Sequence, residues 1–146
     1  MRFEFPEDEQ FFHDLLCEPD EDLRKYESLF DPRPSNVKRN EYNQQRDLLL
    51  SQLLEQYGGA CQLQYRGVCD IQSGIAVDHL IPLSSNKLNK KLRHLSAPPG
   101  KKVPSQSFGS NHPNNLVIAC CNCNNYKKHR FLSRDAMKRI LHMKGL

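Results

Sequence analysis

The sequence predicts a small α+β protein, and three features of its 146 residues lead to this class. Apolar residues recur at helical spacing through much of residues 1–57. Two short runs rich in branched residues follow, at 75–83 and 116–119, and are typical of strands. A last helical pattern closes the chain. A chain of this length forms one domain with a modest core, to which a metal site would add stability.

The first 35 residues are predicted to form an acidic, helical N-terminal extension, residues 1–35. Two apolar stripes at helical spacing indicate one or two short helices: Phe11, Phe12, Leu15 and Leu16, then Leu23, Tyr26, Leu29 and Phe30. The segment Asp31-Pro32-Arg33-Pro34 ends this pattern, because proline lacks the N–H donor and restricts the residue before it. We therefore place a linker there and expect the main domain to cover residues 36–146.

The main domain is expected to begin with a long helix. Asn40 suits the N-cap position, leucines between Leu49 and Leu54 supply an apolar face, and Gly58-Gly59 ends the helix after Tyr57. The first strand is then predicted over residues 75–83.

Residues 84–114 separate the two strands and are rich in Ser, Asn, Pro, Gly and Lys, which predicts a long basic loop. A loop longer than about 15 residues in a compact domain is usually functional or disordered. After the second strand, a helix is expected from near Cys123 to about Leu132. Ser133 is a suitable cap for a last, basic C-terminal helix that contains Ile140.

The charge is distributed unevenly along the chain. Residues 1–35 hold 11 acidic and 4 basic side chains, a net charge of −7. Residues 36–146 hold 6 acidic and 17 basic side chains, a net charge of +11. A basic body of this kind suits a nucleic-acid partner, and the alternative is a basic protein without such a role.

The sequence predicts no membrane partner and a cytoplasmic location. No apolar run approaches the length of a membrane span. The segment Met1–Glu9 lacks the charged-then-apolar order of a signal peptide. Six cysteines in a chain without such a signal favour metal binding over disulfide bonds.

Two pairs of cysteines are predicted to bind a structural zinc ion through four thiolates. The four predicted ligands are Cys61, Cys69, Cys120 and Cys123. Cys120 and Cys123 have the spacing at which one turn offers two sulfurs to one ion, whereas Cys121 would point elsewhere. Cys17 lies in an apolar stripe and is expected to be a packed thiol. The alternative is four unrelated buried thiols.

Polar residues near the strands could hydrolyse a phosphodiester. His79 could accept a proton from water, because imidazole titrates near neutral pH. Asp78 and Asn124 could supply oxygen ligands to a divalent cation, which favours Mg²⁺ or Mn²⁺. Each residue alone has a plainer explanation: a polar turn for Asp78-His79, or a helix cap for Asn124. Their ordered combination with the cysteines favours catalysis.

In this order, the motifs resemble the HNH (ββα-metal) endonuclease family in its four-cysteine variety. The matching segments are the wide pair Cys61–Cys69, Val77-Asp78-His79-Leu80-Ile81-Pro82, Asn115-Leu116, and Cys120-x-x-Cys123-Asn124-x-x-Lys127. The resemblance runs from about Tyr42 to Leu132. The family often has His where this chain has Asn124, and Asn occurs there in its HNN variants.

The resemblance implies a ββα-metal (His-Me finger) core stapled by a four-cysteine zinc, with flanking helices. It also implies a metal-dependent DNA endonuclease that leaves a 3′ hydroxyl and a 5′ phosphate, with His79 as general base. Asn115 takes the family's middle position, where it would brace the loop and orient His79. A homodimer would allow cutting of both strands, and a monomer would favour nicking. The alternatives are a non-catalytic zinc-stapled DNA-binding module and a protein-interaction domain, the latter suggested only by the acidic extension.

Basic residues around these motifs are expected to contact DNA phosphates, which gives salt-dependent affinity with little sequence information. The expected DNA-binding residues are Lys87, Lys90, Lys91, Arg93, Lys101 and Lys102 in the loop, and Lys127, Lys128 and Arg130 in the motif helix. The alternative is a solvated, flexible loop.

Overall fold

The computed structural model describes residues 2–128 and 130–146. In chain order, its main elements are α1 (Pro6–Leu16), α2 (Ser35–Tyr57), β1 (Ile75–His79), α3 (Lys87–Lys91), β2 (Leu116–Cys120), α4 (Cys121–Lys127) and α5 (Arg134–Met143). Short 3-10 segments lie between them: η1 (Leu23–Leu29), η2 (Ile71–Ser73) and η3 (Pro113–Asn115). The protein is therefore of mixed α+β class, as the sequence predicts.

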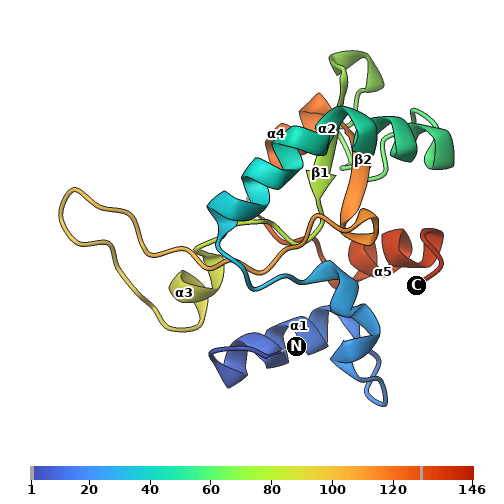
Figure 1. The fold of residues 1–146 in the computed structure, drawn as a ribbon. Helices are drawn as coiled ribbons and strands as arrows, with labels where there is room; N and C mark the ends of the chain where they lie inside the picture. Colours follow the sequence, from blue (N-terminus) through green and yellow to red (C-terminus); the bar gives the residue numbers. More distant parts are fainter. Residues whose placement is uncertain (1, 129) are drawn as a thin grey trace.

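A two-stranded antiparallel sheet lies at the centre of the fold, and α4 follows its second strand directly (Figure 1). The register places Val77 opposite Ile118 and His79 opposite Leu116. All of β2 is buried. Helix α4 contacts both strands. The two strands and this helix therefore form one local unit, although about 36 residues separate the strands in the sequence.

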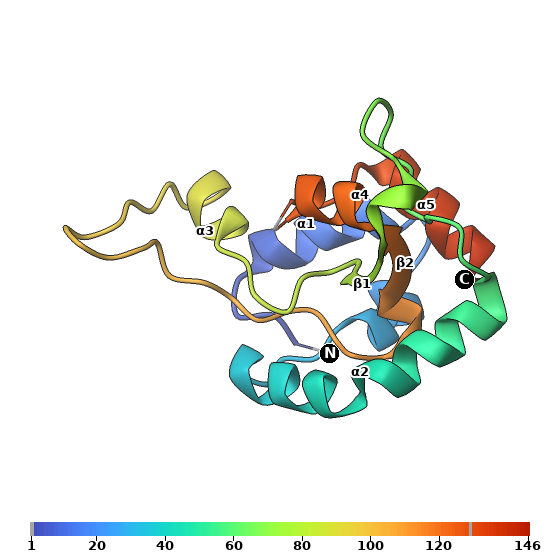
Figure 2. The ribbon, with the colours of Figure 1, turned by 90° about the horizontal axis from the view of Figure 1, so that it is seen from above.

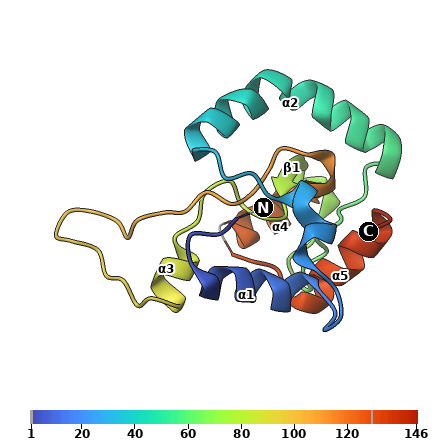
Figure 3. The same ribbon diagram turned by 60° about the horizontal axis from the view of Figure 1, so that its bottom comes forward.

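Helix α2 covers one face of the sheet, and the main core covers the other (Figure 3). Leu116 and Ile118 of β2 pack against Tyr42 and Leu53 of α2. The alternate β2 residues, such as Val117, pack into the main core. This is the alternation expected of a strand buried on both faces.

The acidic N-terminal segment shares the main core with the rest of the chain. Phe12 and Leu16 of α1 are buried in the same apolar cluster as Val117 of β2 and Ile140 of α5. Helix α1 lies beside α5, and the chain after η1 pairs with the loop before β2 through the Phe30–Gly109 bridge. The prolines that follow end the helical pattern without separating the segment from the body.

Three element boundaries differ from the sequence prediction. Helix α2 begins at Ser35, directly after Pro34, instead of at Asn40. Strand β1 ends at His79 instead of Leu83, because its partner begins at Leu116. Helix α4 ends at Lys127 instead of Leu132, because Lys128 has a positive φ of 46°, which is incompatible with a right-handed helix.

The predicted loop over residues 84–114 contains short elements and is fastened at its base. Ser85 and Gln106 exchange two main-chain hydrogen bonds of 3.0 and 2.8 Å. The Asn89 side chain of α3 donates to the Pro104 carbonyl at 2.8 Å. Beyond these ties, residues 95–102 are exposed and project from the body as an arm (Figure 2). In the described part of the chain, no helix combines the length and the apolar character that crossing a membrane requires.

Candidate metal centre and catalytic residues

The four cysteines predicted as zinc ligands come together beside the sheet. The sulfurs of Cys61, Cys69, Cys120 and Cys123 all lie within 4.8 Å of one another. Tetrahedral Zn–S bonds of about 2.3 Å place the sulfurs roughly 3.8 Å apart. The cluster could therefore bind a metal ion such as zinc with a small contraction. It joins the segment before β1 to the junction of β2 and α4.

Main-chain N–H groups point at the sulfurs of this cluster. Tyr65 N donates to Cys123 Sγ at 3.4 Å, and Asp70 N and Cys123 N donate to Cys120 Sγ at 3.4 and 3.3 Å. Burial raises the pKa of Cys120, but the hydrogen bonds from Cys123 and Asp70 outweigh it and lower that pKa to about 6. Burial raises the pKa of the Cys123 thiol. Neighbouring thiols do not all ionise readily, because their thiolate charges repel one another, and a bound cation would offset this repulsion.

Asp78 and His79 are the last residues of β1, and their neighbours lie on opposite sides of the strand. Asp78 faces α4, where the ammonium of Lys127 lies 2.9 Å from its Oδ2. His79 faces α2, where Tyr42 packs edge-on with ring centroids 4.9 Å apart. The alternation of side chains along a strand accounts for this separation.

The Asp78 carboxylate is buried and only partly satisfied. Its Oδ2 has no hydrogen bond within the described residues, because Lys127 Nζ lies at ion-pair distance without hydrogen-bonding geometry. Burial raises the pKa of Asp78, and the charge of Lys127 opposes this rise. A buried carboxylate oxygen that accepts no hydrogen bond can ligate a divalent cation if the cation replaces the lysine, so Asp78 fits the role of an oxygen ligand.

The imidazole of His79 is held between α2 and the loop before β2. Its Nε2 lies 2.9 Å from Oδ1 of Asn111. Burial lowers the pKa of His79 to about 4, the hydrogen bond to Asn111 opposes this shift, and the positive charge of Lys127 adds to it. The imidazole is therefore neutral near neutral pH, which is the form that accepts a proton.

Asn115 is completely buried and fastens the chain that follows His79. Its Oδ1 accepts from Ile81 N at 2.8 Å, and its Nδ2 donates to the carbonyls of Ile81 and Ser110 at 3.0 and 2.8 Å. Its own carbonyl accepts from Leu80 N at 2.8 Å. These bonds are those of a residue that braces the loop. The direct partner of His79 is Asn111, which the sequence did not single out.

Asn124 is the middle residue of α4 and is partly buried. It stands three residues before Lys127, so both occupy the same side of the helix. Lys127 reaches Asp78, and Asn124 is therefore on the side of α4 that faces the end of β1. Within the described residues its side chain makes no hydrogen bond to Asp78 or His79.

The predicted DNA-binding residues divide into two groups. Most are exposed: Lys87, Lys90, Lys91, Lys101, Lys102, Lys128 and Arg130. Arg93 instead makes ion pairs of 2.9 and 3.1 Å with Asp8 and Glu7 of α1. Lys127 is only 1% exposed and bonds the His79 carbonyl at 2.9 Å in addition to its ion pair with Asp78. The expected phosphate contact of Lys127 does not fit this burial.

Several residues around His79 were not predicted from the sequence and are identified by the structure. Asn111 and Tyr42 contact the imidazole of His79, and Arg39 and Lys38 act on it through their charge. A helical spacing of seven joins Tyr42 to Leu49, which could have placed it on the apolar face. No comparable signal distinguishes Asn111 from the other asparagines of its loop.

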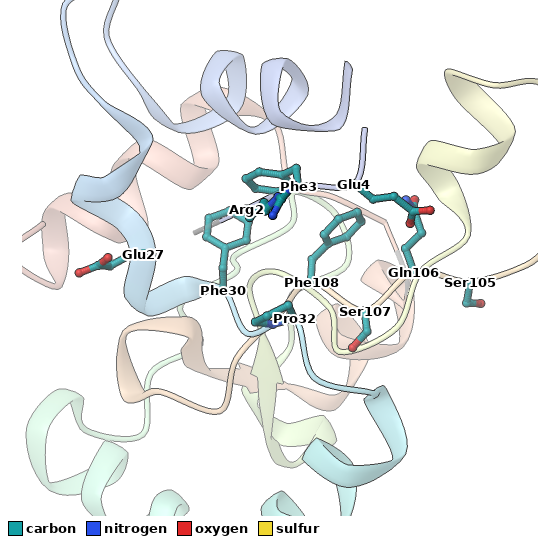
Figure 4. A pocket seen from close by; sticks show the side chains of 10 residues that line it. All are labelled: Arg2, Phe3, Glu4, Glu27, Phe30, Pro32, Ser105, Gln106, Ser107 and Phe108. Carbon is teal, nitrogen blue, oxygen red and sulfur yellow. The ribbon is translucent and has the colours of Figure 1, made fainter. Parts of the chain in front are cut away.

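A cavity of about 600 Å³ lies elsewhere, between the N-terminal segment and the end of the loop (Figure 4). Phe3, Phe30 and Phe108 form its apolar wall. The residues that line it belong to neither strand and not to α4. It is therefore separate from the candidate site.

Comparison of the chain with protein-family models, with curated proteins and with solved structures gives no match. The function proposed below therefore depends on the residues and geometry of the site itself.

Proposed function

We propose that this chain is a metal-dependent DNA endonuclease of the HNH, ββα-metal type. One observation carries the proposal: the Asp78-His79 pair ends a strand whose partner leads directly into a helix, and four cysteines fasten that junction. In such an arrangement a carboxylate and an imidazole from β1 and a carboxamide from α4 can act on one phosphodiester.

His79 is the general base of the proposed reaction. Its neutral imidazole takes a proton from water as the water oxygen bonds to phosphorus, and the bond from phosphorus to the 3′ oxygen breaks with its electron pair on that oxygen. A DNA phosphate beside the imidazole would raise the pKa of His79 from its low value, because negative charge favours the protonated ring. The 3′ oxygen then takes a proton from solvent, so the products are a 3′ hydroxyl and a 5′ phosphate.

Asp78 and Asn124 would hold a divalent cation, Mg²⁺ or Mn²⁺, through oxygen atoms. Asp78 Oδ2, which is buried without a hydrogen bond among the described residues, supports this assignment, and so does the position of Asn124 on the same side of α4 as Lys127. When bound, such a cation stabilises the charge that develops on the phosphate and the leaving oxygen.

The four cysteines would hold a structural zinc ion. Four thiolates leave a tetrahedral zinc with no open position for water or substrate, so the ion would act on folding and not on chemistry. The exposed lysines of α3 and the arm would bind the DNA backbone. A monomer of this kind would nick DNA, and a homodimer would cut both strands.

A non-catalytic, zinc-stapled DNA-binding module is the second candidate function, and the position of Lys127 favours it. The ammonium lies 2.9 Å from Asp78 Oδ2, where it supplies the positive charge that a divalent cation would otherwise supply. In this account Asp78 and Lys127 form a buried ion pair of the core, and the basic surface binds DNA without cleaving it.

Plasmid nicking with Mg²⁺ or Mn²⁺ distinguishes the two candidates. We expect His79→Ala to lose about a hundredfold or more of the nicking rate at unchanged zinc content, since general-base catalysis contributes on this scale. His142→Ala, which removes an exposed histidine of α5, is the matched control and should nick at the wild-type rate. Equal nicking by wild type and His79→Ala, or no nicking at all by the wild type, would favour the DNA-binding module.

A further inference from the structure

We infer that Asn111 is a positioning residue for His79: it holds the imidazole with its proton on Nε2 and leaves Nδ1 as the nitrogen that accepts a proton. The catalytic use of Nδ1 rests on the proposed function. The position of the proton on the neutral ring is independent of that proposal, because it follows from hydrogen bonds within the chain.

The orientation of the Asn111 amide is set by α2. Its Nδ2 donates to the main-chain carbonyl of Lys38 at 2.8 Å. A carbonyl oxygen only accepts, so the amide nitrogen must face Lys38 and Oδ1 must face His79, 2.9 Å from Nε2. Because Oδ1 also only accepts, Nε2 must carry the hydrogen in the neutral ring. The main-chain carbonyl of one residue thereby determines the state of the imidazole.

The loop that carries Asn111 is fastened on both sides. The buried ammonium of Lys38 donates to the carbonyls of Gly109 and Asp31 at 2.5 and 2.6 Å. Gly109 packs so closely on the chain after His79 that an added Cβ would overlap the Ile81 carbonyl. Rotation of the Asn111 amide away from His79 would therefore break its bond to the Lys38 carbonyl of α2, and the loop has no room to move with it.

The other ring nitrogen is open. Within the described residues His79 Nδ1 has no hydrogen-bond partner, and the one buried side-chain polar atom without a partner belongs to Asp78. Nδ1 is therefore the ring nitrogen that remains to accept a proton. In the proposed reaction, Nδ1 takes the water proton, the water oxygen bonds to phosphorus, and the electron pair of the broken bond stays on the 3′ oxygen. Asn111 Oδ1 then keeps its bond to Nε2–H of the imidazolium, so the ring does not turn as it becomes charged.

The experiment reads the protonation site of His79 directly, by two-bond ¹H–¹⁵N correlation of the labelled, zinc-loaded protein. We expect one form in the wild type, with the proton on Nε2. Asn111→Leu keeps the branched shape of the side chain and removes the acceptor, so both neutral forms of the ring should appear. Asn111→Asp keeps an oxygen toward Nε2 and should retain the Nε2–H form. Asn114→Ala is the matched control: it removes a bond to Ser28 in the same loop without touching His79.

DNA cleavage by the same proteins gives the second readout. Asn111→Leu should lose about tenfold or more in kcat with little change in KM, Asn111→Asp should recover part of that loss, and Asn114→Ala should match the wild type. Wild-type His79 with its proton on Nδ1, or Asn111→Leu with an unchanged Nε2–H form and kcat, would overturn the inference. A wild type that shows the Nε2–H form but cuts no DNA upholds the Asn111 assignment and refutes the proposed nuclease.

Discussion

Lys127 is a buried lysine that ties α4 to the end of β1. Its ammonium lies 2.9 Å from both Asp78 Oδ2 and the His79 carbonyl, with 1% of the residue exposed. A buried charge is costly unless it is paired, and removal of one partner leaves the other charge uncompensated. Asp78 and Lys127 therefore depend on each other, unless a metal ion can replace the lysine.

Lys127→Met tests that dependence. Loss of the ammonium should lower the free energy of unfolding by about 3–5 kcal/mol, because the Asp78 carboxylate stays buried without a counter-charge. If Asp78 binds a cation, millimolar Mn²⁺ should restore more stability to this variant than to the wild type. Denaturant unfolding with and without Mn²⁺ measures both effects.

The control for this prediction is Lys128→Met, which removes the exposed neighbouring lysine and should cost little. If the variants of Lys127 and Lys128 were equally stable, the buried ion pair would have no energetic weight. If Mn²⁺ stabilised Lys127→Met no more than the wild type, Asp78 would not be the expected ligand.

For single residues, the sequence was informative where the spacing of side chains is typical of a kind of site. The spacing of Cys120 and Cys123 predicted a shared site, and the sulfur cluster confirms that the four cysteines meet. Asn111 was not predicted, and Lys127 was predicted only as a DNA contact, because the contacts that both make join segments far apart in the chain. A buried lysine and an exposed one look alike in a sequence.

The junction of β2 and α4 is the element on which the candidate site is built. Cys120 ends the strand and also caps the helix, since its sulfur accepts from Cys123 N. The same sulfur lies 4.0 Å from Cys69 Sγ. A metal ion at this cluster would therefore join the strand, the helix and the segment before β1 in one step.

We expect one zinc ion per chain in the purified protein, and its removal by a chelator should unfold the core, because metal binding and folding are coupled in small metal domains. Cys120→Ser should lose the ion and melt at lower temperature. Cys121→Ser, one residue along and outside the cluster, is the matched control and should keep zinc. Metal analysis and thermal melting check these results. A Cys120→Ser protein as stable as Cys121→Ser would contradict a structural zinc.

Element types were more predictable than element ends. Both strands and the helices α2 and α5 have clear apolar patterns, and they occur where those patterns predict. The end of α4 depends on the backbone angle of Lys128, a residue with no preference for a left-handed conformation. Helix α3 has only five residues, too few to show a period.

Over the whole molecule, part of the acidic charge of the N-terminal segment is paired with basic residues of the body. Arg93 pairs with Glu7 and Asp8, and Lys138 pairs with Glu18. All three acidic residues belong to the segment that was predicted to be an extension. The uneven distribution of charge could be counted from the sequence. The ion pairs between the segment and the body could not be predicted, because composition does not show which charged residues lie close together. The apolar stripes of the same segment were the better guide, since they pack into the shared core.

Five exposed lysines lie on α3 and the arm, and the arm extends away from the body. Residues 79–134 contain no Asp or Glu, so nothing on this stretch opposes its lysines. The tip of the arm is a hydrogen-bonded turn, in which Lys101 N donates to the Pro98 carbonyl at 3.0 Å. Gly100 lies within this turn, and its φ of +75° is typical of a tight turn. Such a projection can follow a duplex beyond the candidate site.

Replacing both Lys101 and Lys102 of the arm by Ala should therefore weaken DNA binding and its dependence on salt. Each lost phosphate contact lowers the slope of log affinity against log salt by about 0.9, so the double variant should lose up to roughly 1.8. The measurement uses a His79→Ala background, which keeps the DNA intact. Lys25→Ala, which removes a lysine paired with Glu21 in the N-terminal segment, should leave the slope unchanged. If the arm variant and this control had the same slope, the arm would not contact the phosphate backbone, and DNA binding would have to come from residues nearer to His79.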